Sequence, residues 1–170
     1  MTPPVLRVVG PPGSGKSLLI TSLVEALRTR GHRIATLVPR SETTTVIVLS
    51  HGGRVTLERP MTFEALLGVV ASVDPSVQLV LAEGYDAPGV PAVELRPRGG
   101  SALVPDADRF ALVESEAFAA LFARSGPGET AGLAERIEAE LLGVRTSASS
   151  GRDDEQTGRL GRWVSRFRRP

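Results

Sequence analysis

The segment GPPGSGKS at positions 10–17 carries the residue types that bind phosphate groups. It matches in full the pattern of glycine, any four residues, glycine, lysine and serine or threonine. Its glycines let successive N–H groups turn toward an anion, and a helix that follows adds the positive end of its dipole. A lysine ammonium suits the β and γ phosphates, and a serine hydroxyl suits Mg²⁺. The pattern predicts a site for GTP or ATP with Mg²⁺.

Two side chains of this segment have assigned roles. Lys16 is predicted to be catalytic through its contact with the phosphates, and Ser17 to be a magnesium ligand. Lys16 is the single lysine of the chain, since the other basic residues are arginines. The planar guanidinium of arginine cannot replace a compact ammonium beneath the phosphates. This lysine therefore favours a functional phosphate-binding loop. The residues expected to contact the nucleotide are Pro12, Gly13, Ser14, Gly15, Lys16, Ser17 and Leu18.

A second magnesium ligand, also catalytic, is expected at Glu83. The run 77–82 is almost entirely apolar, as a central parallel strand is, and it ends at Glu83 and Gly84. Ligands of open α/β sheets collect at the carboxyl ends of strands. The alternative is a strand-terminal glutamate that faces solvent. Asp86 is the second choice for the carboxylate.

The remaining patterns predict a three-layer α/β fold of the P-loop NTPase class, with a mostly parallel central sheet. Strands are expected at 5–9, 33–38, 77–82, 91–95 and 109–113, and a hairpin at 44–49 with 54–58. Helices are expected at 17–30, after Thr62, after Ser115 (burying Phe118, Leu121 and Phe122) and at 130–142. Strands that alternate with helices imply a parallel sheet covered on both faces. We expect one nucleotide-binding domain over residues 1–144.

Residues 145–170 form the second region, a basic tail predicted to be disordered. It holds seven arginines against three acidic residues, whereas residues 1–144 have a net charge of −3. Arginines that interleave with Leu160, Trp163 and Phe167 leave open a contact with anionic lipid or nucleic acid. The alternative is a solvated tail, and no nucleic-acid partner is expected.

The composition argues against several other kinds of functional site. The chain has no cysteine and two histidines, which sets zinc sites and disulfides aside. His32 and His51 are both interpreted as surface residues in turns. No window reaches the length of a membrane span, and a cytoplasmic location is expected. Arg96 and Arg98 could approach an anionic substrate, or they could belong to a solvated basic loop.

The sequence resembles the molybdopterin-guanine dinucleotide biosynthesis protein B (MobB) family, a group of small P-loop proteins. Three features carry the resemblance: the loop at 10–17, the helix that ends in RGHR at 30–33, and LVLAEGY at 79–85. It extends over residues 3–142. After the second strand, Arg40, Ser41 and Glu42 stand where the family has a lysine followed by a histidine-rich segment.

The resemblance implies GTP binding with Mg²⁺, weak GTPase activity and a homodimer. It also implies an accessory role in molybdenum cofactor biosynthesis, with a molybdenum cofactor guanylyltransferase or a molybdoenzyme as the partner. The alternative is a small-molecule kinase or ATP-dependent ligase of the dethiobiotin synthetase type, in which the corresponding strand also ends in Glu-Gly. The sequence does not indicate whether the bound nucleotide carries guanine or adenine, because the chain has no Asn-Lys-x-Asp segment.

Overall fold

A computed structural model describes residues 2–125 and 130–144 of the chain. The expected basic tail at 145–170 lies outside the described residues. The elements are β1 (Val5–Val9), α1 (Lys16–Thr29), β2 (Ile34–Pro39), β3 (Thr45–Val48), β4 (Arg54–Leu57), α2 (Phe63–Val73), β5 (Leu79–Glu83), β6 (Ala92–Arg96), the 3₁₀ helix η1 (Asp106–Asp108), β7 (Arg109–Glu114), α3 (Ser115–Ser125) and α4 (Ala131–Glu140).

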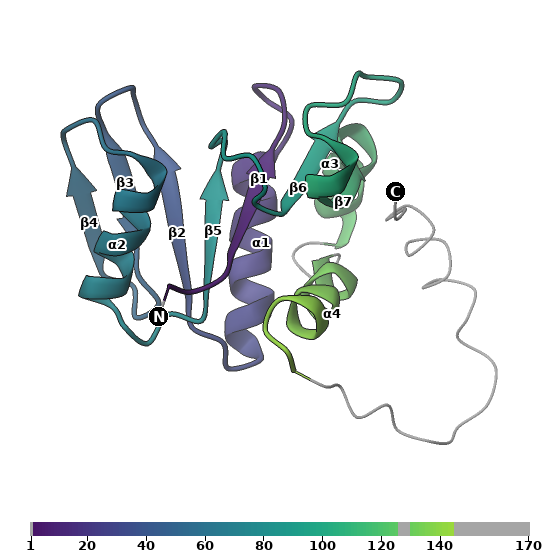
Figure 1. The fold of residues 1–170 in the computed structure, drawn as a ribbon. Coiled ribbons are helices and arrows are strands. Elements are labelled where there is room, and N and C mark those ends of the chain that lie inside the picture. Colours follow the sequence, from purple (N-terminus) through teal and green to yellow (C-terminus); the bar gives the residue numbers. More distant parts are fainter. Residues whose placement is uncertain (1, 126–129, 145–170) are drawn as a thin grey trace, which may run out of the picture.

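Within the described residues, seven strands form one sheet in the order β4-β3-β2-β5-β1-β6-β7. The five strands from β2 to β7 in this order pair in parallel, and β3 and β4 continue the sheet as an antiparallel hairpin. Parallel strands place all their carboxyl ends along the same edge of the sheet, the edge that runs across the strand ends. This edge is the upper one in Figure 1, and it carries the loop between β1 and α1 as well as the end of β5.

The two faces of the sheet hold separate cores. Leu6 and Val8 of β1 pack with α1, α3 and α4 on one face, whereas α2 packs on β2, β3 and β5 on the other. Figure 1 shows α1 behind the sheet and α2 in front of it. Helices therefore cover both faces, which confirms the predicted three-layer α/β fold with a mostly parallel sheet.

The predicted elements are all present, and their ends differ from the predicted ones by at most two residues. Thr62 caps α2 as expected, because its hydroxyl accepts a hydrogen bond from Ala65 N at 3.2 Å. Phe118 of α3 is fully buried. The side chains of Leu121 and Phe122 lie outside what the structure describes.

Beside α2, the same face of the sheet carries charged side chains instead of a second helix. Arg7 of β1, Glu94 of β6 and Arg109 of β7 are buried or nearly so, and irregular segments at 84–91 and 97–108 cover them. Asp106 and Asp108 of η1 complete the ion pairs. We call these five residues the charge layer.

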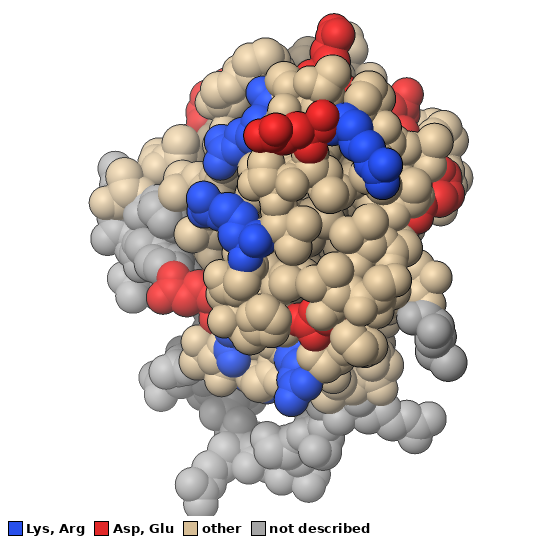
Figure 2. Space-filling view, turned by 90° about the vertical axis from the view of Figure 1, so that its left-hand side faces the viewer, with Lys and Arg blue, Asp and Glu red and all other residues tan. Residues whose placement is uncertain are grey.

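Strand β4 forms an outer edge of the sheet. Arg54 and Thr56 are exposed, and Glu58 and Arg59 follow directly and are exposed too. Figure 2 shows this side of the molecule, where acidic and basic side chains are interspersed. Charged side chains at an edge disfavour pairing with another strand. No helix among the described residues is long and apolar enough to cross a membrane.

Candidate functional site

The loop between β1 and α1 is shaped by its glycines. Gly15 has a φ of 93°, in the left-handed region where a side chain is strained. At Gly10 a Cβ would lie 2.8 Å from the carbonyl oxygen of Leu95, so only glycine allows this close approach to β6. Both glycines of the sequence pattern thus have a structural requirement, and together they turn the chain from β1 into α1.

This turn leaves a row of backbone donors at the start of α1. Ser14 N–H donates to the Pro11 carbonyl at 3.2 Å, but the N–H groups of residues 15–18 have no acceptor within the described part of the chain. Such unpaired donors, together with the helix dipole, favour an anion. Pro12, Gly13 and Ser17 are exposed, so the loop is open to solvent. The side chain of Leu18 packs against the core, which leaves its N–H as the group that would contact a ligand.

Lys16 lies across this loop. Its Nζ donates to the carbonyl oxygens of Gly10 and Pro11, at 3.0 Å each. An ammonium group has three donors, so one remains for a ligand. The two carbonyls hold the ammonium over the loop, beside the unpaired N–H groups.

Ser17 and Glu83 meet at the carboxyl end of β5. The parallel register pairs Val8 with Glu83, which places the end of β5 beside the strand that leads into the loop. The Ser17 hydroxyl donates to Glu83 Oε1 at 2.9 Å, across 66 residues of sequence. The two residues predicted as magnesium ligands are thus in direct contact, whereas a glutamate pointing away from the loop would not reach Ser17.

These two oxygens fit a magnesium ion. Mg²⁺ prefers hard oxygen ligands in octahedral geometry at about 2.0–2.1 Å, so two adjacent ligands lie about 2.9 Å apart. The separation of Ser17 Oγ and Glu83 Oε1 matches this spacing. The site also leaves coordination positions for phosphate and water, because Ser17 is exposed.

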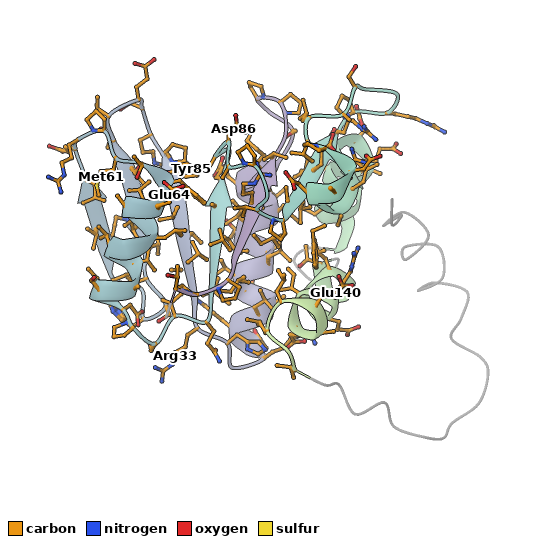
Figure 3. The ribbon with its side chains drawn as sticks, viewed as in Figure 1. Arg33, Met61, Glu64, Tyr85, Asp86 and Glu140 are labelled. Carbon is orange, nitrogen blue, oxygen red and sulfur yellow. The ribbon has the colours of Figure 1, made fainter. Side chains whose placement is uncertain are left out.

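The other predicted charged residues lie elsewhere. Asp86 is exposed at the end of β5, and its side chain points away from the sheet in Figure 3. Arg98 is exposed, as a solvated basic loop requires, whereas Arg96 Nη1 lies 3.7 Å from the buried Glu94. Glu83 is therefore the carboxylate that the fold brings to the loop. Among the described residues, neither Arg96 nor Arg98 has a hydrogen bond or ion pair with Glu83.

Tyr85 anchors the chain just after Glu83. Its ring packs on Phe63 at the start of α2, with 5.1 Å between ring centroids, and its hydroxyl is 3.0 Å from Thr45 Oγ1. Figure 3 shows Tyr85 near Met61 and Glu64 at this end of α2. Burial raises the pKa of Tyr85, and the hydrogen bond with Thr45 offsets part of that rise. The phenol is thus a neutral anchor.

The interpretation of His32 as a surface residue is wrong. Its Nε2 lies 2.6 Å from Glu138 Oε1, and both side chains are mostly buried. Arg30 also donates to Glu138, at 2.7 Å, so Arg30 and His32 together join the end of α1 to α4. Helix α4 therefore buries His32, and the residues next to His32 in the sequence do not indicate this contact. His51 is exposed, as expected.

Sequence reasoning missed the charge layer. Arg7 stands inside the run VLRVV and Glu94 inside AVELR, and the sequence patterns predict strands there without indicating that these two charges are buried. The available signal was the charge itself, because a buried charge needs a partner. The partners come from distant segments, so their identity could not be found from the sequence.

The sheet order and the loop between β1 and α1 define the fold class of P-loop NTPases. Two solved structures similar to this chain are of the family that the sequence resembles. One is a MobB protein homolog from Bacillus stearothermophilus, with 22% identity, a TM-score of 0.49, and coverage of 79% of this chain and 98% of that one. The other is a molybdopterin-guanine biosynthesis protein B, with 22% identity, a TM-score of 0.46, and coverage of 81% and 98%.

These are distant likenesses, and the fold class rests on the sheet order and the loop. No family model matches the chain, and no curated protein matches it.

Proposed function

We propose that the chain binds a nucleoside triphosphate with Mg²⁺ at the loop between β1 and α1. The observation that carries this proposal is the convergence at one edge of the sheet of unpaired N–H groups, the Lys16 ammonium and the Ser17–Glu83 pair. These groups come from two adjacent strands and one helix. They supply the donors for phosphate oxygens and the oxygen ligands for the cation.

Each group has a separate task in this proposal. The N–H groups of residues 15–18 and the Lys16 ammonium hold the phosphates, and Ser17 and Glu83 hold the magnesium ion. A magnesium ion held by these two residues would neutralise part of the charge on the phosphates. Among the described residues, Lys16 is the one basic side chain that hydrogen-bonds to the loop, and in this proposal hydrolysis is slow.

We further propose GTP as the nucleotide and an accessory role in molybdenum cofactor biosynthesis. The support is the sequence resemblance to the MobB family over the loop, the RGHR turn and the LVLAEGY strand. In this role the partner is a molybdenum cofactor guanylyltransferase or a molybdoenzyme, and the chain is a cytoplasmic homodimer. Bound GTP then serves as a signal for assembly.

Calorimetric titration of the full chain with GTP and with ATP, each with and without Mg²⁺, tests both levels of the proposal. We expect GTP to bind more tightly than ATP, and Mg²⁺ to strengthen binding. Absence of binding by either nucleotide contradicts the phosphate site. Tighter binding of ATP, with transfer of the γ-phosphoryl group to a small acceptor in a radiolabel screen, replaces the accessory role by the kinase or ligase alternative.

A further inference from the structure

Arg7 is a buried arginine in the middle of the strand that leads into the phosphate loop. Its side chain is 3% exposed, and its Nε and Nη2 donate to the carbonyl oxygen of Val90 at 3.0 and 2.8 Å. Its Nη1 donates to the carbonyl oxygen of Tyr85 at 3.3 Å. The guanidinium thus holds both ends of the segment 85–90, which follows Glu83 directly.

Asp108 holds the same segment from the other side. Its Oδ2 accepts from Gly89 N at 2.9 Å and lies 3.8 Å from Arg7 Nη2. It is the one carboxylate within 4 Å of the Arg7 guanidinium among the described residues. The segment is therefore fixed at three backbone groups by one pair of opposite charges. A planar guanidinium can make this fork, whereas a lysine ammonium cannot span it in the same way.

This arrangement leaves little freedom for the Glu83 backbone. Gly84 N donates to the Val8 carbonyl at 2.9 Å, and Tyr85 is anchored by its ring and hydroxyl on the far side. Strand β1 carries Arg7, and three residues later it enters the phosphate loop at Gly10. One strand thereby sets the position of the loop and of the segment that follows the carboxylate.

We propose that Arg7 and Asp108 are a positioning pair that holds Glu83 opposite Ser17, so that the carboxylate is in place for the magnesium-dependent part of nucleotide binding. This inference rests on the proposed function. Neither residue touches the nucleotide in this proposal. Their effect acts through the segment 85–90 on the Glu83 carboxylate. Groups that hydrogen-bond a metal ligand directly are typically worth 10- to 100-fold in metal affinity, and because Arg7 and Asp108 act through the backbone we expect the lower end of that range.

The test compares the magnesium dependence of GTP affinity in the wild type, Arg7→Lys and Asp108→Asn. We expect the strengthening of GTP affinity by Mg²⁺ to fall about tenfold in Arg7→Lys, and by a smaller factor in Asp108→Asn. Without Mg²⁺, GTP affinity should stay within about twofold, because the phosphate loop is intact. Asp108→Asn keeps a carbonyl acceptor for Gly89 N and leaves the hydrogen bonds of Arg7 to Tyr85 and Val90 in place, so it is the milder of the two variants.

Arg109→Lys is the matched control. Arg109 is also an arginine of the charge layer, and it pairs with Glu94 at 2.8 Å without contacting the segment 85–90. Its substitution should lower the thermal midpoint but leave the magnesium dependence unchanged. Hydrogen exchange at residues 84–90 gives a second readout, and it should accelerate in Arg7→Lys and not in Arg109→Lys.

The outcomes are distinguishable. Full magnesium dependence in both Arg7→Lys and Asp108→Asn, with normal GTP binding by the wild type, overturns the positioning role alone. An equal loss in Arg109→Lys overturns it as well, since the effect would then be one of general stability. A wild-type chain that binds no triphosphate overturns the proposed function together with this inference.

Discussion

The loop between β1 and α1 follows the carboxyl end of β1, whereas the charge layer includes Arg7 within β1, and the two regions use polar groups in opposite ways. In the loop, the N–H groups of residues 15–18 are unpaired and reachable, and the loop itself is exposed at Pro12 and Gly13. In the charge layer, Glu94 is fully buried and both its oxygens are engaged, by Leu103 N and by Arg109. Unpaired donors suit a ligand, whereas a closed network suits stability.

The energetic consequences of a substitution should differ accordingly. Removing a group from the open loop exposes the remaining groups to water, which solvates them at little cost. Removing one member of a buried ion pair leaves a charge without its partner, at a cost of about 3–5 kcal/mol. We therefore expect binding and stability to respond to different substitutions. Arg7 is buried in the charge layer, and its proposed role is to position Glu83 at the open loop.

The largest expected effect is that of Glu94→Ala on stability. The variant should lose about 3 kcal/mol of unfolding free energy, because Arg109 then has the exposed Asp106 as its one carboxylate partner among the described residues. Chemical denaturation measures this. Glu140→Ala is the control, since it removes a partly exposed helix pair with Arg136 and should cost less than about 0.5 kcal/mol. Equal costs for the two variants would remove the distinction between buried and open charges.

The next effect concerns the open side. Lys16→Ala should weaken GTP binding by more than about 100-fold, or about 2.7 kcal/mol, because the ammonium over the loop is lost. Its unfolding free energy should stay within about 0.5 kcal/mol of the wild type. Calorimetric titration and denaturation of the same sample measure both quantities. Lys16→Arg keeps the charge, and weak binding by this variant would show that a compact ammonium is required.

Glu83→Gln should have a smaller and more selective effect. The variant should lose about tenfold in the magnesium dependence of GTP affinity, because an amide is a weaker ligand for Mg²⁺ than a carboxylate. Binding without Mg²⁺ should be unchanged. Asp86→Asn is the matched control, and it should behave as the wild type. If the loss appears in Asp86→Asn instead, the carboxylate of the site is the exposed one.

The smallest expected effect is that of Asp74→Asn on stability, at a buried carboxylate that accepts hydrogen bonds from neutral groups. Asp74 lies at the opposite edge of the sheet from the loop and accepts hydrogen bonds from Ser50 Oγ at 2.6 Å and from Ser76. These bonds lower the pKa of Asp74 to about 2 from 3.8. The stability they contribute is therefore present above pH 3.8 and is lost as the pH falls toward 2.

Asp74→Asn should cost about 1 kcal/mol at neutral pH, since an amide oxygen still accepts hydrogen bonds. It should also lack this acid-dependent component. Thermal unfolding from pH 2 to 7 measures the difference, and GTP affinity at neutral pH should be unchanged. An identical pH profile in variant and wild type would show that Asp74 keeps an ordinary pKa.

Much of the fold was predictable because its signals are local. The apolar runs at 5–9 and 77–82 and the helical period at 17–30 each lie within one short window. The cap at Thr62 was equally readable. The placement of Glu83 at the carboxyl end of its strand required only the general rule for parallel sheets. His32 was missed because its partner, Glu138, comes from a helix 106 residues later.

The amino-acid sequence alone determined the phosphate loop, because all its backbone donors and its ammonium come from consecutive residues whose glycines dictate the turn. It also determined the alternation of strands and helices. Only the tertiary structure decided that Arg7 points to the covered face of the sheet and that its acceptors lie at Tyr85 and Val90, 78 and 83 residues away. A charge in a strand can face either solvent or the interior, and the direction is set by which distant segments supply its partners.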